Sequence, residues 1–275
     1  MVDAAPRHAL ERGDFEWFRT LIASETGIAL KTTKQSLLEA RLMRRLHALG
    51  LDSFSDYRER LVAEDADGTE LRNFINAITT NKTSFYREPH HFDLLRKEAQ
   101  TWPGEIRIWS AASSTGEEPY SIAFTLLEAG KTLPDVSILA TDIDTEVLER
   151  AERGVYPMEA LPDWDEGRLK RFALRGFGAN DGYFQVRPEI RERIRFGRLN
   201  LVHSGWAVDG VFDAIFCRNV MIYFELPTQQ KIVRRLVRHL RPGGLLFVGN
   251  AETLFWMRDS LTPAAHSAYR LTRQP

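Results

Sequence analysis

The chain has 275 residues, of which 43% are hydrophobic and 27% charged, and this balance excludes collagen-like, disordered and disulfide-scaffold proteins. Its 37 Lys and Arg residues against 38 Asp and Glu residues exclude a protein that coats nucleic acid through excess positive charge. The single cysteine, Cys217, cannot form an internal disulfide, and no apolar run has the length of a membrane span or a secretory signal. We therefore expect a cytoplasmic protein that does not insert into a membrane.

Helical periodicity dominates residues 1–80. Apolar residues recur there at spacings of three and four, which is the period of an amphipathic helix. Gly50 and Gly68 fall between the periodic segments, where helices end. We predict a small helical N-terminal domain over residues 1–80, with these helix stripes: Phe15/Phe18/Ile22, Leu38/Leu42/Leu46, Phe54/Tyr57/Leu61 and Leu71/Phe74/Ile78.

The pattern changes at Glu105, after which short apolar strands alternate with helices. Such alternation predicts an α/β domain with a parallel, doubly wound sheet over residues 81–275. The stretch between Gly154 and Asn200 is irregular and rich in turn residues, and we predict a small β-subdomain insertion there, at about residues 165–192. The predicted strands are Ile106–Trp109, Val136–Thr141, Phe212–Cys217, Leu245–Gly249 and a last one at Ala268–Thr272.

The turn after the first predicted strand, Ser110–Tyr120, is the first candidate ligand site, because ligands of open α/β sheets bind beyond the carboxyl ends of strands. It lacks the G-x-G-x-x-G pattern of a dinucleotide site. Glu117 and Glu118 would repel a pyrophosphate at this helix start, so a cationic cofactor without phosphates, such as S-adenosylmethionine, fits better. The alternative is that the two glutamates only complement the helix dipole, which for Glu117 is an equally good explanation.

Polar residues also follow the later strands. Asp142 suits a ribose diol, while Asp144 is better placed to cap the following helix. Asn200 could hydrogen-bond an adenine edge or simply occupy a turn. Arg218 and Asn219 interrupt an apolar run, which is costly unless they face a polar ligand. We expect no metal site, since the neighbouring His90 and His91 do not share a helix face.

Five segments taken together resemble the CheR family of chemotaxis receptor methyltransferases, and the resemblance covers nearly the whole chain. The segments are NKTSFYRE at Asn81–Glu88, WSAASSTGEEPYSIA at Trp109–Ala123, ATDIDTEVLERA at Ala140–Ala151, FDAIFCRNVMIYF at Phe212–Phe224 and LRPGGLLFVGNAE at Leu240–Glu252. Tyr86 stands where the family often has Phe, and Ala112 where many members have Cys.

The resemblance implies a helical N-terminal domain followed by a Rossmann-like class I methyltransferase domain with a β-subdomain insertion. The implied reaction is methyl-ester formation on glutamate side chains of chemoreceptor cytoplasmic helices, with S-adenosylhomocysteine as product. The resemblance also implies that Arg87 and Tyr223 lie near the transferred methyl group as catalytic residues. The implied cofactor contacts are Asn81, Thr83, Arg87, Ala112, Glu118, Asp142, Asn200, Leu201, Arg218 and Asn219.

Two further features concern the receptor partner. A basic segment with Lys34, Arg41, Arg44 and Arg45 could steer an acidic receptor helix, although a solvated helix face is the usual explanation of such a run. We expect Lys34, Arg41 and Arg45 to share one helical face, opposite much of the leucine stripe. The glycine-rich loop with Gly176, Gly178 and Gly182 resembles the β-subdomain loop of members that dock a receptor C-terminal pentapeptide; otherwise it is an ordinary hairpin turn.

Two alternative functions stay open on the sequence: a methyltransferase for a nucleic acid or small molecule, and a non-catalytic module that binds the cofactor. The balanced charge disfavours nucleic acid. A glutamate acceptor, with a pKa of about 4.3, is ionised at neutral pH and needs no general base. We expect Arg87 to orient that carboxylate, and we expect the protein to be a monomer.

Overall fold

The structure is a computed structural model that describes residues 9–63, 65, 67–161 and 164–274. The chain forms two compact units. The first unit consists of Met1–Thr80 together with Tyr223–Thr228, and the second consists of Asn81–Ile222 and Gln229–Pro275. The short segment Tyr223–Thr228, which the sequence places in the α/β domain, thus groups with the helical unit.

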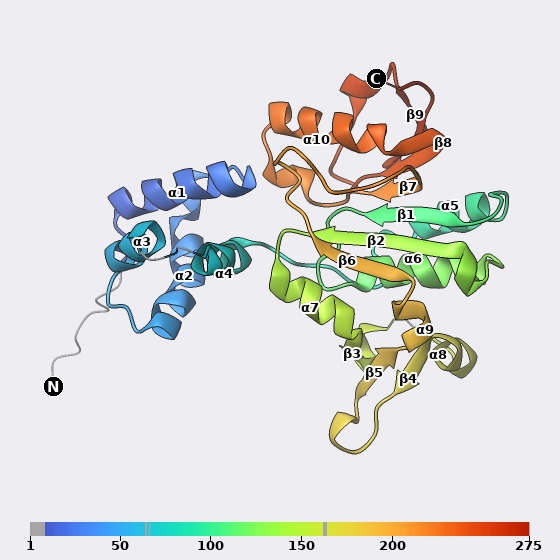
Figure 1. The fold of residues 1–275 in the computed structure, drawn as a ribbon, viewed down its shortest axis with the longest axis horizontal. Helices are drawn as coiled ribbons and strands as arrows, with labels where there is room; N and C mark the ends of the chain where they lie inside the picture. The colour runs from blue at the N-terminus through green and yellow to red at the C-terminus, as the bar shows by residue number, and fades with distance from the viewer. Residues whose placement is uncertain (1–8, 64, 66, 162–163, 275) are drawn as a thin grey trace. The chain divides into compact units, whose positions relative to one another are not determined.

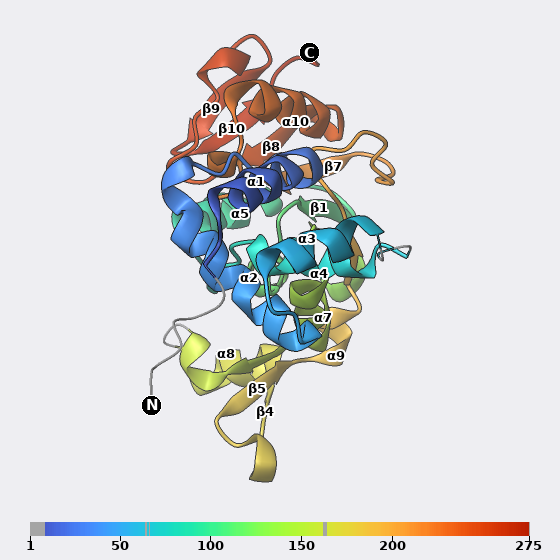
Figure 2. The ribbon, with the colours of Figure 1, turned by 90° about the vertical axis from the view of Figure 1, so that its left-hand side faces the viewer.

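The first unit is helical, as its periodicity predicts (Figure 2). Gly27 and Gly50 end two of its helices in the left-handed conformation that glycine adopts without steric cost. Among its described residues the elements are α1 (Arg12–Thr26), η1 (Thr32–Lys34), α2 (Gln35–Leu49), α3 (Phe54–Ala63) and α4 (Thr69–Ile78).

Aromatic side chains form the centre of this helical unit. The Phe18 ring lies 5.9 Å from the Tyr57 ring and 5.8 Å from the Phe74 ring, centroid to centroid. The buried Tyr57 hydroxyl donates to Oε1 of Glu70 at 2.7 Å, and Arg45 binds the same carboxylate through Nε at 3.0 Å and a terminal nitrogen at 2.5 Å. This three-residue network ties α2, α3 and α4 together.

Seven strands among the described residues form the main sheet of the second unit, in the order β6-β2-β1-β7-β8-β10-β9 (Figure 1). The first five are parallel, and β10 runs antiparallel to both β8 and β9. The strands are β1 (Ile106–Ser110), β2 (Val136–Asp142), β6 (Ile194–Arg198), β7 (Phe212–Phe216), β8 (Leu240–Phe247), β9 (Leu261–Ala265) and β10 (Ala268–Leu271).

Helices cover both faces of this sheet because its central strands are apolar on both sides. On one face, Ile106 and Ile108 belong to a core cluster with residues of the helices that precede and follow β1. On the other face, the Trp109 ring packs edge-on against Trp206 at 5.4 Å. The helices of this unit are α5 (His90–Ala99), α6 (Glu117–Glu128), α7 (Thr145–Arg153), α8 (Glu166–Phe172), α9 (Pro188–Arg191) and most of α10 (Leu226–Arg238). Short η2 (Leu133–Asp135), η3 (Met158–Ala160), η4 (Gly178–Asn180) and η6 (Phe255–Met257) also belong to it, while η5 (Met221–Tyr223) and α10 contain residues that group with the first unit.

A second, three-stranded antiparallel sheet lies in the order β3-β5-β4, formed by β3 (Val155–Pro157), β4 (Ala173–Arg175) and β5 (Tyr183–Val186). This is the predicted β insertion, but its sheet begins at β3, before residue 165. The sequence prediction missed β3 because three residues are too few to show a period. None of the helices in the described residues is both long and apolar enough to cross a membrane.

Candidate functional site

The candidate site lies at the carboxyl edge of the main sheet, where the strand order reverses between β1 and β7. Chain connections diverge at this point, so the loops after β1 and β7 leave the sheet in opposite directions and expose their residues to a ligand. The turn after β1 is compact: Gly116 has φ 98°, and a Cβ there would lie 2.6 Å from the Tyr156 hydroxyl and 2.8 Å from Ala151 Cβ. The predicted glycine turn therefore brings α6 against α7.

Asp142 ends β2 as a buried carboxylate held by two backbone amides. Its Oδ2 accepts from Ser114 N at 2.8 Å, and its Oδ1 accepts from Asp144 N at 3.1 Å. Burial, followed by the charge of Asp144, outweighs these bonds and raises the pKa of Asp142 to about 6. A carboxylate has about four acceptor positions, so Asp142 keeps the capacity to accept from a ribose hydroxyl besides the backbone amides.

Asp144 performs the capping role that the sequence predicts. Its Oδ1 accepts from Glu146 N at 2.9 Å and from Val147 N at 3.3 Å at the start of α7. Its Oδ2 accepts from Asn81 Nδ2 at 2.6 Å, while the Asn81 carbonyl accepts from Ser114 Oγ at 2.9 Å. The segment that begins at Asn81 is thus held against the ends of β1 and β2.

Arg218, which is 5% exposed, lies between two carboxylates at the end of β7. One terminal nitrogen is 2.9 Å from Glu118 Oε2 and the other is 3.1 Å from Glu88 Oε2. The second nitrogen also donates to the Arg87 carbonyl. Glu118 in turn accepts from Ser110 Oγ at 2.7 Å. With the three side chains charged, two carboxylates and one guanidinium carry a net charge of −1, which suits a cationic ligand.

The pKa values of these groups follow from burial and from Arg218. Burial raises the pKa of Glu118 and Arg218 opposes that shift. Burial also acts to raise the pKa of Glu88, but Arg218 and hydrogen bonds from Asn219 and Asn250 lower it on balance. Burial, the charge of Arg218 and His90 lower the pKa of His91 to about 3, so this imidazole is neutral at physiological pH.

Backbone strain gathers at the same edge. Of the five non-glycine residues with positive φ in the described chain, four lie in the segments just named: Tyr86, Glu88, Ser114 and Asn219, with φ between 48° and 59°. A left-handed conformation costs an L-residue about 1–2 kcal/mol. Surrounding contacts must maintain such strain, and it concentrates at functional sites.

The loop after β6 carries Asn200 and Leu201, and two side chains hold it. Trp206 Nε1 donates to the Asn200 carbonyl at 3.1 Å, and Asn200 Oδ1 accepts from Val202 N at 3.0 Å. Arg235 of α10 donates to the carbonyls of Val202 and His203, at 3.2 and 2.8 Å. Asn200 is therefore a turn residue at a strand end, and both of the roles weighed for it are compatible with this geometry.

The other predicted site residues fall into two places. Thr83, Arg87 and Ala112 are half-buried in the segments beside Arg218 and Asp142, and Arg87 donates to the Lys82 carbonyl at 2.8 Å. Tyr223 belongs to the segment that groups with the first unit, where its carbonyl accepts from Ala29 N at 2.9 Å. Cys217 is buried, and burial raises the pKa of its thiol well above the usual range, as expected of a small hydrophobe.

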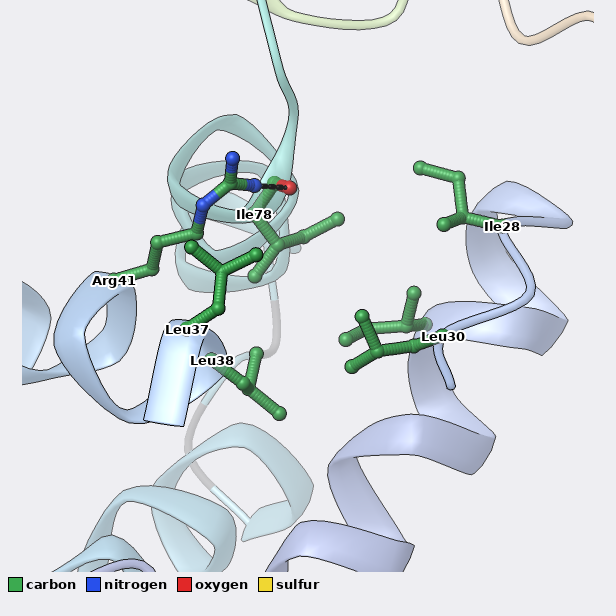
Figure 3. Close-up of a pocket in the computed structure, with 7 residues that line it drawn as sticks. Ile28, Leu30, Leu37, Leu38, Arg41 and Ile78 are labelled. Atoms are coloured by element: carbon green, nitrogen blue, oxygen red, sulfur yellow. Dashed lines mark hydrogen bonds between the residues drawn. The ribbon is translucent and has the colours of Figure 1, made fainter. Parts of the chain in front are cut away.

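The basic segment of the first unit differs from the expected solvent-facing run. Arg41 donates to the Ile78 carbonyl (Figure 3). It also donates to Thr80 Oγ1 at 2.7 Å, and Arg45 binds Glu70. Arg41 and Arg45 share a face of α2, but the expectation that this face lies opposite the leucine stripe is wrong, because both arginines bind groups of α4 and the residues that follow it. Lys34 precedes α2, in η1. Arg44 and Lys34 are exposed.

The same region holds a mostly apolar pocket, shown in Figure 3. Its polar lining residue, Arg41, donates to the Ile78 carbonyl. The pocket lies among Ile22, Ile28, Leu30, Leu37, Leu38, Arg41 and Ile78.

The glycine-rich loop is the hairpin between β4 and β5. A Cβ at Gly176 would collide with the Asn180 carbonyl, whereas Gly178 and Gly182 have positive φ and open surroundings. Phe177 at its tip is 86% exposed. The turn itself therefore favours glycine at all three positions, at Gly176 for lack of space and at Gly178 and Gly182 for their positive φ.

Sequence reasoning missed two carboxylates, Glu88 and Glu252, at the carboxyl edge of the main sheet. Glu88 accepts from Asn219 Nδ2 at 3.2 Å, and the buried Glu252 accepts from Asn219 N at 3.0 Å. Both stand in segments that carry the family resemblance, and a charged residue in the turn that follows an apolar strand is the signal that would have found Glu252. No group of three or more possible metal ligands occurs among the residues that the structure describes.

The strand order, with its antiparallel β10 next to β8, is that of a class I methyltransferase, and the sheet edge that it places at the site is acidic. The family description "CheR methyltransferase, SAM binding domain" matches residues 81–269, and "CheR methyltransferase, all-alpha domain" matches residues 13–79. The chain belongs to the CheR methyltransferase family.

Curated relatives carry names that agree with this family. The chemotaxis protein methyltransferase of Klebsiella aerogenes is 44% identical over 275 residues, covering 100% of this chain and 94% of the relative. That of Escherichia coli is 44% identical over 274 residues, covering 99% and 96%. Chemotaxis protein methyltransferase 2 of Pseudomonas aeruginosa is 49% identical over 246 residues, covering 88% and 86%. The chain is therefore an enzyme of S-adenosylmethionine-dependent methylation in chemotaxis.

Proposed function

We propose that this enzyme esterifies glutamate side chains on the cytoplasmic helices of chemoreceptors, yielding glutamate methyl esters and S-adenosylhomocysteine. The observation that carries the proposal is that the carboxylates around Arg218 bind that cation and are not free to act as a general base. Glu118 and Glu88 bind Arg218, and His91 is buried with its pKa lowered to about 3. A carboxylate acceptor, already ionised at neutral pH, needs no base.

The residues of the edge fit the cofactor. Asp142 would accept from the ribose hydroxyls, and the Asn200–Leu201 loop would flank the adenine. The Glu118–Arg218–Glu88 set, with Asn219, would face the cationic methionine end, and the segment with Asn81, Thr83 and Arg87 would close over it beside Ala112. The cofactor supplies a methyl group activated by the sulfonium. The protein supplies alignment, which is the main requirement of an in-line displacement.

Arg87 would orient the acceptor carboxylate. In this proposal, a guanidinium on the cofactor-facing segment offers charge-assisted hydrogen bonds in a fixed plane. Its backbone is held in place, since its carbonyl accepts from Arg218 and its amide donates to the Ser84 carbonyl at 3.3 Å.

Incubation with methyl-labelled S-adenosylmethionine and receptor cytoplasmic fragments should label the receptor with a group that alkali releases as methanol. Replacing Arg87 with Ala should lower the rate of receptor methylation by about 100-fold, since the acceptor is no longer aligned. The released methanol is scored against time at saturating cofactor.

Nucleic acid and small-molecule acceptors serve as controls and should remain unlabelled. Alkali-stable label on the receptor would contradict ester formation. Wild-type turnover by Arg87→Ala would contradict the orienting role while leaving the ester chemistry intact.

The receptor-facing basic surface is best represented by Lys34 and Arg44, since Arg41 and Arg45 bind groups within the helical unit. Charge reversal of both residues, Lys34→Glu with Arg44→Glu, should lower kcat/KM for receptor by about tenfold at low salt, because steering of an acidic helix is lost. The effect should shrink at high salt. Cofactor affinity, measured by calorimetry, should stay unchanged.

The matched control is the pair Lys231→Glu and Arg234→Glu, two exposed residues of α10 that undergo the same charge change. Equal losses in both double variants would indicate a general charge effect and contradict a specific receptor surface.

The small sheet supports a second receptor contact within the same proposal. β4 is an edge strand of that sheet, and its neighbouring hairpin carries the exposed Phe177. An extended receptor tail could pair with such an edge and raise the local concentration of acceptor sites.

A further inference from the structure

The turn that follows β7 is held by a buried carboxylate from the other side of the site. Glu252 stands after β8 and is 6% exposed. Its Oε2 accepts from Gly249 N at 2.5 Å and from Asn219 N at 3.0 Å, and its Oε1 accepts from Ile222 N at 3.2 Å. One side chain thus connects the ends of the neighbouring strands β7 and β8 through three backbone amides.

Only an ionised carboxylate satisfies all three amides. A glutamine in the same place has one acceptor oxygen, and its NH₂ group would face an amide donor. Burial raises the pKa of Glu252 while the backbone amides oppose that shift. Burying a charged group is costly unless its hydrogen bonds are satisfied, and here the donors are all backbone amides. This points to a role for Glu252 in fixing the local backbone conformation.

The conformation that it controls is that of Asn219, which has φ 58°. The Asn219 side chain donates to Glu88 Oε1 at 3.2 Å, so Glu252 holds the backbone of this residue and Glu88 holds its amide. Packing is tight around it: a Cβ at Gly249 would lie 2.8 Å from Asn219 N and 2.9 Å from Glu252 Oε2. Asn219 cannot relax to an ordinary φ without breaking these contacts.

We infer that Glu252 is a positioning residue for methyl transfer, which holds Asn219 in its left-handed conformation and so presents the Arg218–Asn219 pair to the cofactor. The inference rests on the proposed function, in which Asn219 contacts the cofactor. Glu252 acts through Asn219 and does not itself touch a reactant.

A double-mutant cycle on cofactor affinity tests this role. Glu252→Gln should raise the Kd of S-adenosylmethionine by about 10- to 100-fold, because a misplaced group contributes little binding. Asn219→Ala should raise it by a similar factor. The double variant should bind no more than about threefold more weakly than the weaker single variant, since both changes remove the same contact. The KM for receptor should stay within twofold of wild type.

The matched control is Asp213→Asn at the opposite end of β7, a carboxylate that also accepts from a backbone amide, Arg107 N at 2.8 Å. It should lower thermal stability without changing the Kd of the cofactor. If Glu252→Gln fails to fold, Glu252→Asp keeps two acceptor oxygens on a shorter side chain and takes its place in the cycle, with a smaller expected loss.

The outcomes distinguish the positioning role of Glu252 from the cofactor contact of Asn219. The positioning role would be overturned if the two single-variant increases in the Kd of S-adenosylmethionine multiplied in the double variant. It would also be overturned if Asp213→Asn raised that Kd as much as Glu252→Gln does. In either case Asn219 would remain in the cofactor site. An unchanged Kd for Asn219→Ala would instead remove Asn219 from the proposed cofactor site, and the inference would fall with it.

Discussion

Replacing Asp142 with Asn should weaken S-adenosylmethionine binding by about 100-fold, because hydrogen bonds to a charged acceptor contribute about 1.5–3 kcal/mol each. Asp142 already accepts from the amides of Ser114 and Asp144. An asparagine has one acceptor oxygen, so it cannot serve both amides and also accept from the ribose. Calorimetric titration with S-adenosylmethionine measures the loss directly.

The pH dependence of binding gives this prediction a second readout. The pKa of Asp142 is raised to about 6, and hydroxyl donors from the cofactor would favour the ionised form and lower it. The affinity should therefore be highest above pH 6 and fall as the pH drops, by at most about tenfold per unit. The Asp142→Asn variant should lack this slope.

Asp165→Asn, the same change at the exposed cap of α8, provides the control and should bind normally, since Asn caps about as well as Asp. A wild-type affinity that stays constant between pH 5 and pH 7, at an unchanged fold, would contradict the ribose role of Asp142.

Replacing Arg218 with Met should lower the free energy of unfolding by about 3–5 kcal/mol, because it leaves the buried Glu118 and the half-buried Glu88 without their shared cation. The Phe92 ring, whose centroid lies 5.7 Å from the guanidinium carbon, would also lose a cation–π partner. Arg218→Lys should fall between wild type and Arg218→Met, since an ammonium cannot form the planar fork. Chemical denaturation measures the difference.

Adding Glu118→Gln to Arg218→Met should recover part of the lost stability, because one of the two uncompensated charges is then removed. The control is Arg241→Met, which breaks the more exposed ion pair with Asp213 and should cost at most about 1 kcal/mol. If the two Arg variants lost equal stability, or if Glu118→Gln deepened the loss, the buried-charge explanation would be wrong.

The predictable part of the fold is that which rests on local signals. The helix stripes of Phe15/Phe18 and Leu38/Leu42 lie on α1 and α2, and the strands after Glu105 form the parallel sheet. Asp144 caps α7 as expected, because an N-cap needs only the residues that follow it. The prediction of a Rossmann-like methyltransferase behind a helical domain is confirmed by the strand order and by both family matches.

The rest depended on contacts between residues distant in sequence. The expectation that Arg41 and Arg45 lie on a receptor-facing surface did not anticipate Ile78 and Glu70, which are 37 and 25 residues away. The link between Glu88 and Asn219 spans 131 residues, so no periodicity could indicate it. β3 was missed because its pairing with β5, and not its own three residues, makes it a strand.

The sequence by itself determined the family, the longer helices and central strands, and the residue types at the ends of those strands, because period, caps and strand termini are local properties of the chain. The tertiary structure alone decided which charges bind one another and which remain exposed. Arg218 between two carboxylates, Glu252 on three backbone amides and Arg45 on Glu70 are examples. A buried charge needs an opposite charge or hydrogen-bonding groups beside it, and only the fold brings these partners close to it.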